Sequence, residues 1–350
     1  MKKPIPSKNH SRADKKNTVT IFDVAQKAGV SIATVSRALS NDPLLSRSVK
    51  EREKVLAAAK ALGYTPNLSA QGLRQKQTNL IAVSGWFKGR SFTSIETLLG
   101  IHQRLAETKY AVYLRENHEN YRLDERIITD LAQKASVCGV ILLNHRVRKN
   151  AIMPLKKMRI PLLVTEYILP GVDSLTIDNF RGGYMAVQHL LDRGCRNIAI
   201  TAGWLKHPHL RNRILGCRKA LQEAGFPLRG SFLINPHLHL YGEGQRAAKK
   251  ILELKPRVDG IFSAAGDTVA MGIINCFKEN GLRVPEDIRV VGFDDIQESA
   301  YFEPALTTVH QPVFELGVKA ADRLVHTLEG KRPGVGTIVL EPTLVVRKSS

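Results

Sequence analysis

The fold of this chain is decided by residues 20–39, whose sequence is TIFDVAQKAGVSIATVSRAL. Apolar residues recur at helical spacing on both sides of Gly29, which is placed to end a first helix. Thr20, with Asp23 three residues later, predicts the N-cap of that helix, and Ser31 predicts the N-cap of a second one. Two helices joined by so tight a turn predict a helix-turn-helix, in which the second helix enters the major groove of DNA.

The predicted second helix has two different faces. Val35, Ala38 and Leu39 are spaced to pack on a core. Four residues at helical spacing form the opposite face: Ile32, Ala33, Ser36 and Arg37. Exposed isoleucine and alanine side chains fit contacts with thymine methyl groups or sugar edges, and Thr34 and its polar neighbours can reach phosphates or bases. The alternative is a helical hairpin with a purely structural role.

A third helix is expected to follow. Ser48 and Glu51 have the spacing of a capping box, and an apolar stripe continues to Leu62, directly before Gly63. We therefore expect a headpiece of three short helices over residues 18–64. A linker containing several proline, glycine and glutamine residues follows over residues 65–78.

The charge of the chain is concentrated in this first part. The chain has 350 residues, 43% of them hydrophobic, and a formal net charge of +20. Residues 1–78 hold 15 Lys/Arg and 5 Asp/Glu, so half of the net charge lies in under a quarter of the chain. A basic end of this kind suits a polyanion, and nucleic acid in particular. The alternative is a basic tail that only aids solubility, and residues 1–17 are expected to be a disordered basic tail.

The composition also bears on the compartment. The four cysteines are widely spaced and form no C-x-x-C pair, which disfavours a disulfide framework and a cysteine-based zinc site. The first residues lack the apolar core of a signal peptide, and the chain has no run of about 18 apolar residues. We expect a cytoplasmic protein.

From Leu80 onward, short apolar runs alternate with helical patterns. The runs are 80–83, 137–143, 161–164, 198–201, 258–262 and 288–293. Such alternation over some 270 residues predicts an α/β architecture with parallel, doubly wound sheets. Ligands bind such sheets at the carboxyl ends of the strands.

Two long stretches resemble the LacI/GalR family of bacterial regulators. Residues 18–64 are similar to the family's DNA-binding headpiece. Residues 79–347 are similar to its periplasmic-binding-protein-like effector domain, through ordered motifs such as Asp178-Asn179, Gly266-Asp267 and Val290-Val-Gly-Phe-Asp-Asp. The resemblance implies two subdomains, an N-subdomain of about 79–177 and 309–336 and a C-subdomain of about 178–308 and 337–347.

The resemblance also implies which residues contact DNA. Ile32 and Ala33 hold the positions that discriminate bases in the family, and Tyr64 and Asn67 hold positions that contact the DNA backbone. The full set of expected DNA contacts is Thr20, Ile21, Ser31, Ile32, Ala33, Thr34, Ser36, Arg37, Ser40, Tyr64, Asn67, Ser69, Ala70 and Leu73.

Residues 67–74 match the hinge helix of the family. Isolated helices below about 12 residues are marginal, and Gly72 lowers helix stability further, by about 1 kcal/mol relative to alanine. Such a segment can fold on DNA and melt elsewhere, as a switch requires. In the family the hinge inserts a leucine pair into the minor groove, and Leu73 holds that position here. The alternative is an ordinary interdomain linker.

Several residues of the larger domain have the chemistry to bind a small effector. Arg213 offers a planar fork of donors to a hydroxyl pair or a carboxylate. Asp294 and Glu166 follow predicted strands and can accept from sugar hydroxyls, and Trp204 can stack on a sugar ring. The alternatives are a structural ion pair for the charged residues and core packing for the tryptophan.

Two features bear on the kind of effector. Gly266 stands where the family usually has an effector-binding asparagine, so we expect a lost contact and a larger pocket. His209 and Arg211 add positive charge near Arg213, which favours an acidic sugar or a sugar phosphate.

Other chemistry is less well supported by the sequence. The pairs His207/His209 and His237/His239 could bind metal, but no further ligands stand at a fixed spacing. Gly242-x-Gly244-x-x-Ala247 fits a dinucleotide fingerprint only loosely, because no apolar strand precedes it. Glu166 with Asp294-Asp295 could suggest a glycosidase carboxylate pair. We expect neither a catalytic site nor a cofactor or metal.

The sequence therefore predicts a homodimeric transcription regulator that binds a pseudo-palindromic operator. Its most natural role is repression of carbohydrate-metabolism genes, controlled by a sugar, sugar acid or sugar phosphate. A regulator responsive to purines or other metabolites, or an activator, is the alternative within this architecture. A sugar-transport protein would need an export signal and no headpiece, and an enzyme on an α/β scaffold would turn its ligand over.

Overall fold

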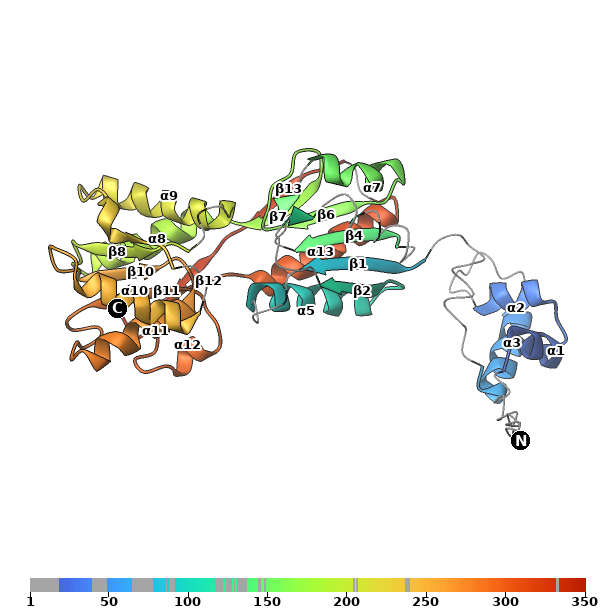
Figure 1. Ribbon diagram of the computed structural model, residues 1–350. Coiled ribbons are helices and arrows are strands. Elements are labelled where there is room, and N and C mark those ends of the chain that lie inside the picture. The colour runs from blue at the N-terminus through green and yellow to red at the C-terminus, as the bar shows by residue number, and fades with distance from the viewer. Residues whose placement is uncertain are drawn as a thin grey trace, which may run out of the picture. The chain divides into compact units, whose positions relative to one another are not determined.

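The computed structural model describes residues 19–39, 49–64, 78–85, 87, 92–116, 122–123, 128, 130, 137–143, 146–147, 149–203, 205, 207–236, 240–331 and 334–350. The chain divides into two compact units, Met1–Lys76 and Gln77–Ser350 (Figure 1). The expected basic tail, the expected cap Ser48 and the hinge residues 67–74 lie outside the described residues. Among the described helices, none is both long and apolar enough to cross a membrane.

The first unit contains three helices, α1 (Ile21–Ala28), α2 (Ile32–Leu39) and α3 (Val49–Leu62). The backbone N–H of Thr20 donates to Asp23 Oδ2 at 2.7 Å, and Gly29 ends α1 with φ of 65°. The backbone N–H of Thr34 donates to Ser31 Oγ at 3.1 Å. These contacts confirm the predicted caps. The three helices enclose a small core, which consists of Val24, Ala25, Val35, Ala38, Val55, Ala58 and Ala59.

The second unit begins with a lobe built on a six-stranded sheet, which we name the first lobe. Its strand order is β13-β7-β6-β4-β1-β2 and all its pairings are parallel. The strands are β1 (Leu80–Gly85), β2 (Ala111–Glu116), β4 (Gly139–Leu143), β6 (Leu162–Thr165), β7 (Asp173–Ile177) and β13 (Thr337–Leu340). A separate parallel pair joins β3 (Arg122–Leu123) to β5 (Arg146–Val147).

Helices cover both faces of this sheet. One face packs its Ile81, Val83 and Ile141 side chains against α5 (Phe92–Ala106) and α13 (Val313–Leu328). The other face packs against the 3-10 helix η2 (Lys149–Ile152) and α7 (Met153–Lys157). Because alternate residues of each central strand enter different cores, β1, β4 and β6 are largely apolar and buried, as is typical of parallel strands covered on both faces.

The second lobe repeats this plan. Its sheet has the order β14-β12-β11-β10-β8-β9, parallel except for β14 at the edge. The strands are β8 (Ile198–Thr201), β9 (Leu233–Ile234), β10 (Gly260–Ser263), β11 (Arg289–Asp294), β12 (Thr307–His310) and β14 (Thr343–Val345).

The helices of the second lobe also lie in two layers. The pair α8 (Asn179–Asp192) and α9 (Pro208–Glu223) covers one face. The pair α10 (Tyr241–Leu252) and α11 (Asp267–Glu279) covers the other. The short elements η3 (Gly230–Phe232) and α12 (Glu298–Tyr301) complete the lobe.

Helix pairs approach closely where glycines face a neighbouring backbone. A Cβ on Gly183 of α8 would collide with the carbonyl oxygen of Arg213 in α9, and a Cβ on Gly216 of α9 with that of Phe180. Because each helix has a glycine at the crossing point, no side chain separates the two backbones, and α9 lies close against α8. This packing holds Arg213 beside the first turn of α8.

The chain passes between the lobes three times, and two of the predicted boundaries differ from the structure (Figure 1). We expected residues 337–347 in the C-subdomain, but β13 pairs with β7 of the first lobe, with Thr337 beside Ser174. We expected residue 309 onward in the N-subdomain, but β12 pairs with β11 through His310. The passages therefore lie directly after β7, β12 and β13. A short apolar run does not itself specify which sheet it joins.

Candidate functional site

Five of the predicted DNA-contact residues lie on α2. Ala33 and Arg37 are exposed, and Thr34 and Ser36 are half-buried. Arg37 Nε donates to the carbonyl oxygen of Ala33 at 3.2 Å, and the hydroxyls of Ser31 and Thr34 lie 2.9 Å apart. The polar groups at the start of α2 are thus ordered by bonds within the helix.

Ile32 differs from the expectation of a freely exposed side chain. It is half-buried and packs on the headpiece core together with Ile21 and Tyr64. Its position in the first turn of α2 lets part of the side chain reach that core. Substitution of Ile32 would therefore change both the surface and the stability of the headpiece, whereas Ala33 belongs to the surface alone.

The headpiece shows one further exposed apolar residue that the sequence reasoning missed. Phe22 is 66% exposed and lies two residues after the N-cap Thr20, which is also exposed. It lies off the helical stripe that Ile21, Val24 and Ala25 form, and this spacing was the signal that could have found it. Of the other predicted DNA contacts, Ser40, Asn67, Ser69, Ala70 and Leu73 lie outside the described residues.

In the second unit, Arg213 lies at the centre of a polar cluster. Its side chain is buried, and Nε donates to Asn179 Oδ1 at 2.8 Å. Nη1 donates to the carbonyl oxygen of Ala264 at 2.9 Å, and Nη2 donates to Gln311 Oε1 at 3.4 Å. The guanidinium carbon lies 3.5 Å from the centre of the Phe293 ring. Three of the five N–H groups therefore donate to the protein itself.

Three carboxylates lie within electrostatic reach of this arginine: Asp267, and two that stand at strand ends. Glu166 follows β6 of the first lobe, and Asp294 ends β11 of the second. Burial raises the pKa of Glu166 to about 7, the charge of Arg213 acts against this rise, and Asp294 adds to it. Burial lowers the pKa of Arg213 to about 10, against the charges of Asp294 and Glu166, so it stays protonated at neutral pH. Strand ends of both lobes thus supply one cluster.

Gln311 connects the two charged groups of the second lobe. Its Oε1 accepts from Arg213, and its Nε2 donates to Asp294 Oδ1 at 2.6 Å. Sequence reasoning missed both this glutamine and Asn179 as members of the cluster. The motif Asp178-Asn179, which contains the asparagine, was noticed only as part of the family pattern.

The space beside Gly266, where we expected a lost contact and a larger pocket, is next to the carboxylate of Asp294. A Cβ at this position would lie 2.8 Å from Asp294 Oδ2, so the carboxylate already occupies the neighbouring space. The φ of Gly266 is 112°, which L-residues rarely adopt. Glycine here both permits this backbone and makes room for Asp294.

Arg211 and His209, which we expected to add positive charge near Arg213, differ from that arginine in how far they are buried. Arg211 is exposed, whereas Arg213 is buried, because residues two apart on a helix face different ways. His209 is half-buried, with its ring centre 5.3 Å from that of the buried His207. Trp204 lies outside the described residues. The structure therefore gives the cluster fewer cationic neighbours than the sequence suggested.

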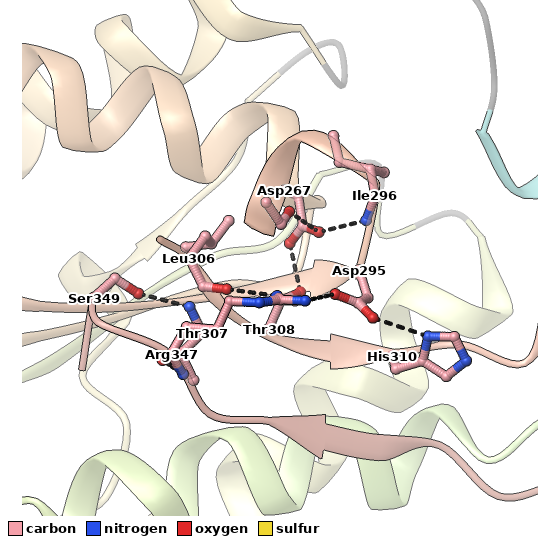
Figure 2. Close-up of polar contacts among 10 residues, drawn as sticks. Asp267, Asp295, Ile296, Leu306, Thr307, Thr308, His310, Arg347 and Ser349 are labelled. Carbon is pink, nitrogen blue, oxygen red and sulfur yellow. Dashed lines mark hydrogen bonds and ion pairs between the residues drawn. The ribbon is translucent and has the colours of Figure 1, made fainter. Parts of the chain in front are cut away.

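The third carboxylate, Asp267, is fully buried and was not predicted as a member of the cluster. Asp267 accepts from Thr308 Oγ1 at 2.6 Å, from Ser299 Oγ at 2.8 Å and from the backbone N–H of Ile296 at 3.0 Å (Figure 2). Burial and the nearby charge of Asp294 raise the pKa of Asp267, while these hydrogen bonds oppose the rise. Gly292 is needed beside it, because a Cβ there would collide with Asp267 Oδ1.

A metal site finds no support in the part of the chain that the structure describes. No group of three His, Cys, Asp or Glu side chains there could hold a metal ion. His207 and His209 are neighbours without a third ligand of this kind, and His237 and His239 lie outside the described residues.

Models of known protein families match parts of both units of the chain. A model of the bacterial regulatory proteins, lacI family, matches residues 20–67, and a model of the periplasmic binding protein-like domain matches residues 187–350. Catabolite control protein A of Priestia megaterium is 32% identical over 335 residues, which cover 95% of this chain and 99% of that protein. This chain belongs to the LacI family. It is a DNA-binding transcription regulator with a helix-turn-helix headpiece and an effector domain of two α/β lobes.

Other similar proteins include regulators with different names and solved structures with different bound molecules. The transcriptional repressor PurR of Erwinia tasmaniensis is 35% identical, with 94% of this chain and 96% of that protein covered. The lac repressor dimer bound to operator has a TM-score of 0.81 at 28% identity and covers 95% of this chain and 99% of its own. A transcriptional regulator CelR–cellobiose complex has a TM-score of 0.71 at 30% identity and covers 95% and 100%.

Proposed function

We propose that this regulator represses carbohydrate-metabolism genes and that a neutral, polyhydroxylated ligand controls its affinity for operator DNA. The ligand binds at the cluster of Glu166, Arg213 and Asp294. The observation that carries this proposal is the composition of the cluster: two carboxylates, one from each lobe, surround a single buried arginine.

The charge balance of the cluster favours a neutral ligand over an acidic one. Arg213 gives three N–H groups to protein acceptors, and its charge is opposed by Asp294, Glu166 and Asp267. An added carboxylate or phosphate would meet these negative groups in a region of low dielectric constant. Sugar hydroxyls donate to carboxylates and accept from the two further N–H groups of the arginine. This is a narrower ligand class than the sequence alone suggested.

The exposure of residues on α2 supports different roles for different residues of the headpiece in DNA binding. We assign base contacts to Ala33 and Ile32 at the start of α2, with Ser36 and Arg37 reaching phosphates or bases. Ala33 and Arg37 are exposed, as such contacts require. Residues 67–74 act as the switch between the two units, with Leu73 as the minor-groove wedge.

A homodimer is supported by apolar residues on the first lobe. Ile95 and Leu99 of α5 and Tyr113 and Leu114 of the edge strand β2 are all more than a third exposed. A second copy of the chain would bury this surface and present two headpieces to a pseudo-palindromic operator. Sedimentation of the chain at several concentrations tests the dimer.

The experiment that tests the ligand class is a thermal-shift panel. Ribose and cellobiose represent neutral sugars, gluconate a sugar acid, glucose 6-phosphate a sugar phosphate, and hypoxanthine a purine. A specific ligand at 100 times its dissociation constant stabilises the folded chain by about 2.7 kcal/mol. We expect a shift with a neutral sugar. A shift with hypoxanthine alone would favour the alternative hypothesis of a purine-responsive regulator, to which the similarity to PurR also points.

The same panel separates binding from turnover. We propose that the ligand is bound unchanged, as a regulator requires, and that the protein works in the cytoplasm. Glu166 and Asp294 are nevertheless two carboxylates in one cluster, as glycosidases use. Analysis of the cellobiose sample for released glucose tests this, because accumulating glucose would indicate an enzyme.

A further inference from the structure

The carboxylate of Asp294 is carried by a strained turn. Asp294 ends β11 with φ of 116°, and Asp295 follows with φ of 57°. L-residues rarely adopt such a backbone conformation, and it persists only where the surroundings hold it. Two in succession require strong contacts on both side chains.

The segment that leaves the second lobe supplies one set of contacts. His310 ends β12, in register with Asp294, and Gln311 follows it. Gln311 Nε2 donates to Asp294 Oδ1 at 2.6 Å, and His310 Nδ1 lies 3.1 Å from Asp295 Oδ2. Two consecutive residues of the passage to α13 therefore hold the two consecutive residues of the turn.

The last residues of the chain supply a second set, which Figure 2 shows together with the contact between His310 and Asp295. Arg347 Nη2 donates to Asp295 Oδ1 at 2.7 Å, and Nη1 donates to the carbonyl oxygen of Leu306 at 2.8 Å. Two residues further on, Ser349 Oγ donates to the carbonyl oxygen of Val290 in β11 and accepts from the backbone N–H of Thr307 in β12. Ser349 thus fastens the segment that carries Arg347 to both β11 and β12.

These contacts are partly shielded from water. The side chains of Asp295 and Arg347 are 16% and 19% exposed, whereas that of His310 is 45% exposed. Charge-assisted hydrogen bonds at such exposure are stronger than surface ion pairs. Burial works to raise the pKa of Asp295, but the hydrogen bonds from His310 and Arg347 lower it below its ordinary value. Asp295 is therefore an anion held by two cationic or donor side chains.

We propose that Asp295, His310 and Arg347 form a positioning site. It fixes the direction of the Asp294 carboxylate and links the effector cluster to the passage between the lobes. None of the three is assigned to the ligand itself; they act through Asp294. The proposal deepens the proposed function, because it takes Asp294 as a ligand-binding group.

A first test needs no ligand. Hydrogen exchange of the unliganded, full-length chain is compared in wild type, Arg347→Met and Arg283→Met. Arg283 is the matched control, because it pairs with Asp287 in the same lobe on an exposed surface. We expect Arg347→Met to raise exchange about tenfold in the peptide that contains residues 294–297, with β8 unchanged, because local opening is governed by local contacts. Unchanged exchange in 294–297, or an equal rise throughout the lobe, would overturn the positioning site.

A second test asks whether the site acts through Asp294. With ribose or cellobiose as the probe, whichever binds the wild type, we expect Arg347→Met to weaken binding about tenfold, as loss of one charge-assisted hydrogen bond predicts. In the Asp294→Asn background the same change should have almost no further effect, because the two residues then share one pathway. Additive losses in the double variant would show a merely structural role and refute the inference.

Two further variants keep the test informative. Arg347→Lys retains the charge and should restore part of the affinity, and Asp295→Asn removes the same contact from its other side if Arg347→Met does not fold. If neither sugar binds the wild type, the proposed ligand class fails, while the exchange experiment still decides the positioning site. The two failures are therefore distinguishable.

Discussion

The headpiece and the effector cluster obtain their functional surfaces in opposite ways. In the headpiece, the residues assigned to bases lie next to one another at the start of α2, Ala33 exposed and Ile32 half-buried. In the cluster, Glu166, Arg213 and Asp294 come from β6, α9 and β11, and they meet only because strand ends of both lobes converge. The first surface depends on one helix being formed. The second depends on two lobes being folded and correctly joined, so the two should respond differently to substitution.

The largest expected effect falls on the cluster. Arg213→Met removes donors to Asn179, Ala264 and Gln311 and leaves two carboxylates without their cation. With charge-assisted bonds at about 1.5–3 kcal/mol each, affinity for the sugar identified by the panel should fall about 100-fold or more. Titration calorimetry measures this, and Arg218→Met, an exposed change on the same helix, is the control. Undiminished binding to Arg213→Met would remove the cluster as the effector site.

The next effect falls on the headpiece and should leave the cluster untouched. Ala33→Gln replaces an exposed methyl group on α2, and each base contact contributes about 1–3 kcal/mol of discrimination. Selection from random DNA should therefore recover a different base pair at one position of each half-site, with sugar affinity unchanged. Ala57→Gln, an exposed change on α3, should recover the wild-type site. The same selected sequence for wild type and Ala33→Gln would contradict the assignment.

A smaller effect is expected at Gly266, where the cluster depends on the backbone. Asparagine there combines a φ of 112° with a Cβ 2.8 Å from Asp294 Oδ2, so the second lobe should lose about 1–3 kcal/mol of stability and the sugar should bind more weakly. Gly281→Asn has a φ of 78° and nothing within 4 Å of the added Cβ. Urea denaturation and calorimetry compare the two variants. If Gly281→Asn weakens sugar binding as much as Gly266→Asn does, the contact between residue 266 and Asp294 is not the cause of the weaker binding.

The last effect is a pH dependence, which changes stability without removing a contact of the ligand. The pKa of Glu166 is about 7 in the folded chain, above its ordinary value of 4.5, so the folded state binds more protons between these values. Stability from this group is therefore present below about pH 4.5 and is lost as pH rises towards 7, by at most about 1.4 kcal/mol per pH unit. Glu166→Gln abolishes this loss, so its stability relative to wild type should improve from pH 5 to pH 7.5 in urea denaturation without ligand. A constant difference would show that Glu166 does not titrate in this range.

Local signals were sufficient for the headpiece. The caps at Thr20 and Ser31 and the stop at Gly29 were predicted correctly, because each depends on residues within one helical turn. The partial burial of Ile32 was not, because it depends on how α2 packs against the rest of the headpiece. In the larger unit, the strand at 198–201 was predicted with its exact bounds, whereas β7 and β12 were missed, since their polar residues interrupt the apolar run.

The sequence by itself determined the class of this protein: a helix-turn-helix followed by parallel α/β lobes, with Arg213, Glu166 and Asp294 as polar residues at strand ends and helix starts. These features follow from the spacing of apolar residues and from capping, which are local. Only the tertiary structure decided that Gly266 makes room for Asp294, that Gln311 joins Asp294 to Arg213, and that Arg347 holds the turn beside them. These contacts join residues far apart in the chain, and their partners are set by sheet order and lobe passages that no local pattern specifies.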